Sequence, residues 1–182
     1  MALSRKRAGA LAAAMAVVAS LAMTGSAFGA DHRVVKVQDD CDQATFDAVV
    51  GPGTCVGDGR TLFADFLAEF QAEGSVDGWA FSRPDFNIDA GGSIDAVNQG
   101  GEFHTFTQVA QFGNGCVPLL NADDSPPVVD CNALGDSAVL PGQTRTFTVP
   151  ATSGTVLYQC AIHPWMRSVV DVRAKGNRGG SG

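Results

Sequence analysis

Near its C-terminus the chain reads Tyr158-Gln-Cys-Ala-Ile-His-Pro-Trp-Met166, which places Cys160, His163 and Met166 at successive intervals of three residues. Pro164 disfavours a continuous helix through this stretch, because proline lacks a backbone N–H and its ring clashes with the preceding helical turn. The segments on either side are short and rich in Val, Thr and aromatic residues, which is typical of strands. We therefore expect a loop between the last two strands that brings a thiol, an imidazole and a thioether into one pocket.

The cysteine count singles out the thiol of this loop. The chain has five cysteines, at positions 41, 55, 116, 131 and 160. In an oxidising compartment thiols pair as disulfides, and an odd count leaves one unpaired. The first four can pair in three ways, of which we prefer Cys41 with Cys55 and Cys116 with Cys131, because these pairs close short loops. Cys160 is then left free. Because an exported protein meets an oxidising environment, we expect a ligand such as a metal to bind this thiol.

The residue types in the loop favour copper over zinc. Zinc accepts thiolate and imidazole but seldom a thioether, whereas copper is bound by one thiolate, two imidazoles and a weak axial methionine. A second imidazole is required, and the chain offers three histidines in all, His32, His104 and His163. His32 lies near the expected mature N-terminus and His104 lies in a strand-like segment, so we expect one copper ion held by His104, Cys160, His163 and Met166.

The segment from Tyr158 to Arg167 resembles the copper-binding loop of the cupredoxin family, in the short form found in amicyanin, through the proline after the histidine and the Met-Arg step. The region from Trp79 to Phe106, in which Asn98-Gln-Gly-Gly-Glu-Phe-His104 leads to the first ligand, is similar to the N-terminal half of the family. The resemblance covers residues 76–174. It implies a Greek-key β-sandwich with a type 1 (blue) copper ion near one end, with Cys160 as thiolate, the two histidines equatorial and the methionine axial. A threonine follows His104 where those relatives often have asparagine, and the segment before residue 76 has no counterpart in the small cupredoxins.

Hydrophobic periodicity along the chain agrees with that fold class. Apolar residues recur at spacings of three and four over 61–73, which predicts a helix that ends at Gly74 and either packs on the core or binds a partner. From residue 76 the period changes to two, with expected strands around Trp79–Phe81 and Ile94–Val97 and at 103–109, 143–149, 155–160 and 168–174. We expect an all-β, cupredoxin-like Greek-key β-sandwich with a short N-terminal helical extension.

The residues at the two ends of the chain indicate where the folded domain begins and ends. Arg5-Lys6-Arg7, an apolar run over 10–23 and small residues up to 30 form the order of a secretory signal peptide, cleaved after Gly29 or Ala27. The run is too short for a membrane-spanning helix. We expect a signal peptide at 1–29, an extension at 30–75 with the helix at 61–73, a cupredoxin domain at 76–174 and a flexible tail at 175–182. The irregular stretch 113–142 is either a docking loop or an excursion tied down by a disulfide.

Loss of the three basic leader residues moves the formal charge from −7 to −10. An acidic surface disfavours nucleic acid and suits basic partners, although it also serves solubility alone. We expect a secreted or periplasmic monomer that carries one electron at a time between redox partner proteins. The alternative is copper storage or delivery. An enzyme is not expected, because further copper centres need several more histidines.

Electrons would leave through His163, beside which Pro164 and Trp165 form either an apolar contact patch or ordinary packing.

Overall fold

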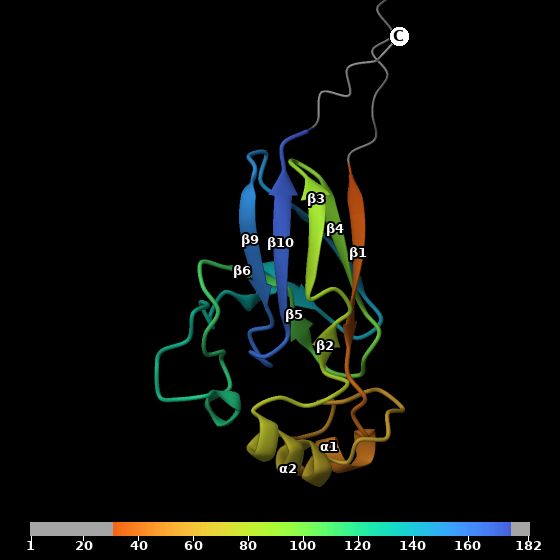
Figure 1. Ribbon diagram of the computed structural model, residues 1–182. Coiled ribbons are helices and arrows are strands. Elements are labelled where there is room, and N and C mark those ends of the chain that lie inside the picture. The colour runs from red at the N-terminus through yellow and green to blue at the C-terminus, as the bar shows by residue number, and fades with distance from the viewer. Residues whose placement is uncertain (1–30, 176–182) are drawn as a thin grey trace, which may run out of the picture.

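The computed structural model describes residues 31–175. The expected signal peptide, and the expected tail beyond Lys175, lie outside these residues. The described chain forms two four-stranded sheets packed face to face, with two helices across one end (Figure 1). The all-β sandwich expected from the sequence is therefore confirmed.

The first sheet has the strand order β2-β1-β4-β8, and the second has the order β3-β10-β9-β6. The strands of the first sheet are β1 (His32–Gln38), β2 (Ala80–Phe81), β4 (Ser93–Asn98) and β8 (Thr144–Thr148). Those of the second are β3 (Asp85–Asp89), β6 (Thr107–Val109), β9 (Gly154–Gln159) and β10 (Arg167–Arg173). The consecutive strands β3 and β4 lie in different sheets, and β1 runs parallel to β4 as β3 does to β10. Such crossovers between sheets distinguish a Greek-key arrangement from a simple meander.

Alternating side chains of the strands form the core between the sheets. Exposed and buried residues alternate along β10 over its whole length, and partly and fully buried residues alternate along β4. Period-two patterning of this kind is what a strand with one inward face requires. The buried aliphatic residues of the two sheets meet in one cluster, which includes Val35, Ile94 and Ala96 from the first sheet and Val156, Val170 and Val172 from the second.

Strand β1 comes from the expected N-terminal extension, yet it pairs with β4 from His32 opposite Ser93 to Val37 opposite Asn98. Residues 32–38 are thus part of the sandwich sheet. The helical segment that follows, up to about residue 79, is what the extension adds at the end of the sandwich.

That end is covered by α1 (Gln43–Val49) and α2 (Phe63–Glu73). Helix α1 was not expected from the sequence; its N-cap is Asp42, whose carboxylate accepts the backbone N–H of Thr45 at 2.9 Å. Helix α2 starts two residues later than expected and ends as expected at Gly74, which adopts the left-handed conformation with φ 70°. No helix within residues 31–175 is long and apolar enough to cross a membrane.

The stretch 113–142 is more ordered than the sequence indicates. It contains the 3₁₀ turns η1 (Pro118–Leu120) and η2 (Leu134–Asp136) and the short strand β7 (Ala138–Val139), which pairs with β5 (His104–Thr105). A disulfide joins Cys116 to Cys131, and a second joins Cys41 to Cys55. Both pairings agree with the local pairing preferred from the sequence, and Cys160 is free and buried.

Candidate metal centre

The loop between β9 and β10 holds three of the four expected ligands. The backbone N–H of Cys160 donates to the carbonyl of Met166 at 3.0 Å, and the N–H of Met166 donates to the carbonyl of His163 at 3.0 Å. The strands on either side continue this pairing, with Gln159 opposite Arg167. The loop is therefore a tight turn closed by backbone hydrogen bonds, as expected from Pro164, and not a helix.

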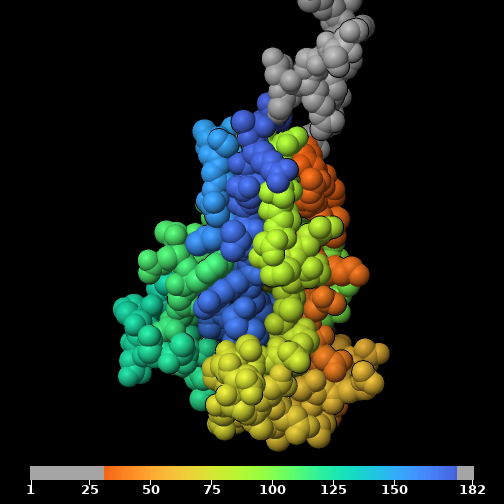
Figure 2. Space-filling view, viewed as in Figure 1, coloured from red at the N-terminus to blue at the C-terminus, as the bar shows by residue number. Residues whose placement is uncertain are grey.

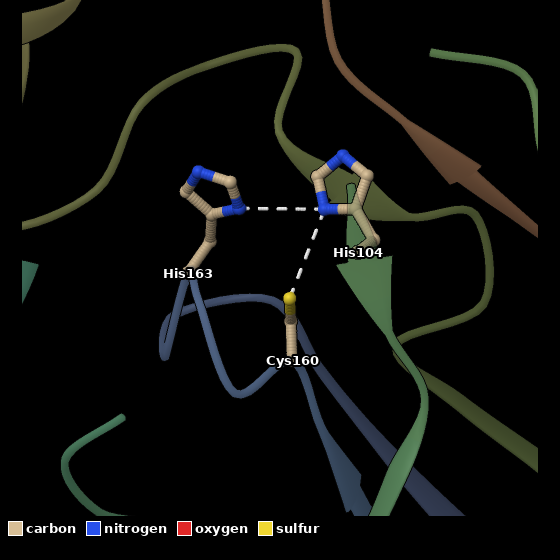
Figure 3. Close-up of side chains that lie close together, drawn as sticks. All are labelled: His104, Cys160 and His163. Carbon is tan, nitrogen blue, oxygen red and sulfur yellow. Dashed lines mark hydrogen bonds between the residues drawn. The ribbon is translucent and has the colours of Figure 1, made fainter. Parts of the chain in front are cut away.

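The fourth residue, His104, reaches the same place from β5. Ligand atoms of His104, Cys160 and His163 all lie within 4.8 Å of one another. The two Nδ1 atoms are 3.3 Å apart, and the Cys160 sulfur lies 3.7 Å from Nδ1 of His104 (Figure 3). All three side chains are buried, with at most 2% of each residue exposed. Two ring nitrogens and a sulfur that converge in a buried pocket form an arrangement able to bind a cation.

Met166 lies in the core beside the site, and His32 lies away from it. Met166 is 1% exposed and belongs to the core cluster, and its backbone bonds to both Cys160 and His163. His32 is half-exposed, pairs with Asp95 at 3.0 Å and is the first residue of β1, which starts at the end away from the helices (Figure 1). The structure thus joins three predicted ligands through their side chains and the methionine through the loop backbone, and it keeps His32 apart.

The electrostatics of the three converging residues favour a thiolate. Burial alone would raise the pKa of the Cys160 thiol, but its hydrogen bonds with His104 and His163 bring that pKa well below its ordinary value. Burial alone would lower the pKa of His104, whereas its hydrogen bonds with Asp39 and Cys160 raise it to about 9. The two imidazoles thus favour the thiolate form of Cys160, which is the form that binds a metal cation.

Each histidine has a buried carboxylate at its far nitrogen. Nε2 of His104 lies 2.8 Å from Asp39, and Nε2 of His163 lies 3.6 Å from Glu102. Burial alone would raise the pKa of Asp39, but the bond with His104 and two backbone N–H groups lower it, whereas burial raises the pKa of Glu102. Glu102 also accepts the indole N–H of Trp79. Sequence reasoning missed both carboxylates, and only the nearness of Glu102 to His104 in the chain pointed to one of them.

Thr105 connects the two halves of the site. Its hydroxyl accepts the backbone N–H of Ala161 at 2.7 Å and is hydrogen-bonded to Thr107 at 2.8 Å, and its own N–H lies 3.5 Å from the Cys160 sulfur. Thr105 thus ties the strand of His104 to the loop of Cys160.

Helix α2 covers the loop that carries His163. The ring of Phe66 packs edge-on against His163 at 6.3 Å and lies 6.2 Å from Trp165, and Phe70 lies 5.2 Å from the same tryptophan. In Figure 2 the atoms of α2 lie directly against those of the C-terminal part of the chain. Pro164 is buried and Trp165 is partly buried. Of the two interpretations of this pair, packing is the one that these contacts support.

An apolar cavity of about 200 Å³ lies beside the covered histidine. It is bounded by the two helices, the turn η1 and the Cys160 loop, with His163 and Glu102 among its lining residues.

The segments around this end are strongly acidic. Residues 39–79 contain nine acidic residues and one basic residue, and residues 113–142 contain four acidic residues and no basic one.

No protein-family model matches the chain, and no curated protein matches it either. Solved structures similar to it include a mutant of amicyanin in its reduced Cu(I) form at pH 4, with 20% identity, a TM-score of 0.35 and coverage of 54% of this chain and 77% of that one. A purple cupredoxin from Nitrosopumilus maritimus has 20% identity, a TM-score of 0.38 and coverage of 54% and 86%. A second amicyanin mutant, in the Cu(I) form, has 19% identity, a TM-score of 0.34 and coverage of 59% and 89%. These similarities concern the fold alone.

Proposed function

We propose that this chain is an exported type 1 copper protein that carries one electron at a time between redox partners, with copper held by His104, Cys160, His163 and Met166. The observation that carries this proposal is the convergence of two Nδ1 atoms and one unpaired sulfur in a buried pocket. Four other cysteines form disulfides, so the single thiol kept free is the one that faces two imidazoles.

The donor set fits copper. One thiolate and two imidazoles with a methionine nearby are the ligands of type 1 copper, whereas structural zinc sites use four Cys or His ligands. Bound copper would supply a one-electron couple between Cu(I) and Cu(II). The protein's own part is to keep the four side chains in one geometry for both oxidation states and to exclude water, and the hydrogen bonds of Thr105 and the cover of α2 serve both purposes.

The remaining features support an electron carrier over an enzyme. The chain has three histidines, and the third, His32, lies at the far end of β1. A type 2 or type 3 copper centre would need more imidazoles than remain. Two disulfides and a leader-like N-terminus support a secreted or periplasmic location. The acidic segments around the helical end support basic redox partners. We propose that the protein acts as a monomer.

The first experiment is to add Cu(II) to the purified chain from residue 30 onward and record its visible absorption and electron paramagnetic resonance. We expect an intense thiolate-to-copper band and a reversible one-electron potential. Cys160→Ser should abolish the band. His104→Gln should abolish it too, whereas His32→Gln, the same change at the histidine outside the site, should leave it intact.

Three outcomes would count against the proposal. Retention of the band in Cys160→Ser would remove the thiolate assignment. Met166→Gln should lower the potential, because an oxygen ligand favours Cu(II), and an unchanged potential would argue against an axial thioether. A copper-loaded protein that passes its metal to a chelator within seconds, without reversible redox cycling, would instead support the alternative of storage or delivery.

A further inference from the structure

Asp39 is a buried carboxylate outside the region that resembles known copper proteins. Its side chain and that of His104 are both fully buried, and the carboxylate lies 2.8 Å from Nε2 of the ring. A buried carboxylate is costly unless hydrogen-bond donors surround it. Here the donors are the ring and the backbone N–H groups of Gly101 at 2.9 Å, Glu102 at 3.1 Å and Cys41 at 3.3 Å. A carboxylate with four donors is an ionised group held in one orientation.

The local structure is shaped around this carboxylate. A Cβ atom on Gly100 would lie 1.8 Å from Oδ2 of Asp39, and one on Gly101 would lie 2.4 Å from the backbone nitrogen of Gly57. The two glycines therefore let the end of β1 and the segment after the disulfide Cys41–Cys55 approach the strand that leads to His104. No other residue type fits at either position without moving backbone or the carboxylate itself.

An ionised carboxylate only accepts hydrogen bonds, so the nitrogen that it faces must carry the proton. When a metal displaces any proton on Nδ1, the ring keeps its proton on Nε2 and offers the lone pair of Nδ1, and Nδ1 is the atom that faces Cys160 and His163. The carboxylate thus selects the tautomer that a metal ligand needs and fixes the plane of the ring. Its negative charge also makes the imidazole a stronger donor, which favours Cu(II) over Cu(I).

We infer that Asp39 is a positioning residue of the metal centre, which orients His104 for copper and holds the reduction potential down. This inference rests on the proposed copper site. Removal of a hydrogen-bonding partner behind a metal ligand lowers metal affinity by about 10- to 100-fold. If the loss falls on Cu(II) alone, each tenfold loss raises the potential by about 59 mV for one electron.

The test compares Asp39→Asn with Asp40→Asn, the same change at the next residue, whose carboxylate faces Thr61 at 3.3 Å. We expect Asp39→Asn to keep the thiolate-to-copper band, to bind Cu(II) about 10- to 100-fold more weakly and to have a higher potential. Asp40→Asn should match the wild type in all three. An Asp39→Asn protein that is less stable but has unchanged Cu(II) affinity and potential would overturn the inference, because it would show a structural role only.

A measurement on the unaltered chain tests the inference even if the Asp39→Asn variant does not fold. In the diamagnetic Cu(I) protein, nitrogen NMR should show the proton of His104 on Nε2, in slow exchange with water. A proton on Nδ1, or rapid exchange at Nε2, would overturn the inference. A wild-type protein without any thiolate-to-copper band would instead refute the proposed function, so the two failures are distinguishable.

Discussion

Removal of the Thr105 hydroxyl should lower the free energy of unfolding by an amount that follows from the buried hydrogen bond it makes. Thr105 is fully buried, and its Oγ1 accepts the N–H of Ala161 at 2.7 Å in the interior. Thr105→Val keeps the shape of the side chain but leaves that N–H without an acceptor. A buried donor without a partner costs about 1–3 kcal/mol. Thr107 keeps its bond with Ser137, so the loss is confined to the link with the Cys160 loop.

We therefore expect Thr105→Val to lower the free energy of unfolding of the metal-free protein by about 2 kcal/mol. For a chain of this size that corresponds to a fall in Tm of roughly 4–8 °C. The assay is urea unfolding of the oxidised, metal-free protein, followed by tryptophan fluorescence. The copper-loaded variant should also show a shifted thiolate-to-copper band, because the loop beside Cys160 has lost one of its anchors.

Thr146→Val is the matched control. The hydroxyl of Thr146 makes a hydrogen bond of its own, donated to Asp95 at 2.6 Å, but at the surface of β8. Water can replace that bond, so the cost should stay within about 0.5 kcal/mol. Equal stability of the two variants would refute the reasoning, because Ala161 would then have another acceptor or the cost of burial would be absent.

Three further predictions concern the helical end. Phe66→Ala removes a buried ring that packs on His163, so the free energy of unfolding should fall by about 3–5 kcal/mol. A chelator should also extract copper faster from this variant. An unchanged extraction rate would mean that α2 does not restrict access to the site. Gly101→Ala should weaken Cu(II) binding in a direct titration, because its Cβ would lie 2.4 Å from a backbone nitrogen, whereas Gly135→Ala, with nothing within 4 Å, should bind copper as the wild type does. Electron exchange with the cation hexaammineruthenium should slow as salt is added, and exchange with the anion ferricyanide should speed up, because the segments around the helical end are acidic; the opposite pair of trends would place the exchange at another surface.

The strands and the disulfides were predictable because their causes are local. Period-two alternation marks β4, β9 and β10 in the sequence, and closely spaced cysteines favour local pairing. Strand β3 was missed because acidic residues at Asp85 and Asp89 hide its alternation, which becomes clear only beside β10. Helix α1 has seven residues in a segment rich in Gly and Asp, too short for a periodic pattern. The candidate ligands follow from residue types and from a resemblance, and their role as ligands stays a prediction.

The surroundings of the candidate site were not predictable, because tertiary structure alone creates them. Asp39 and His104 are 65 positions apart, and nothing in the local sequence distinguishes Asp39 from Asp40. The parallel pairing of β1 with β4 ends at Val37 opposite Asn98, and this register brings the residues after β1 beside Gly100 and Gly101. A contact of this kind becomes visible only once the order of strands in the sheet is known.

These surroundings also bear on the choice between carrying electrons and storing copper. A store must release its metal, and release requires at least one ligand to swing away. Here His104 is held by Asp39, His163 lies under Phe66 with Glu102 behind it, and the Cys160 loop is tied to Thr105. Copper bound in such a pocket could leave only after a helix or a disulfide-tied segment had moved. One-electron transfer, by contrast, benefits from a site that does not rearrange. The enclosure therefore favours the carrier, and copper release from the wild type as fast as from Phe66→Ala would reverse that preference.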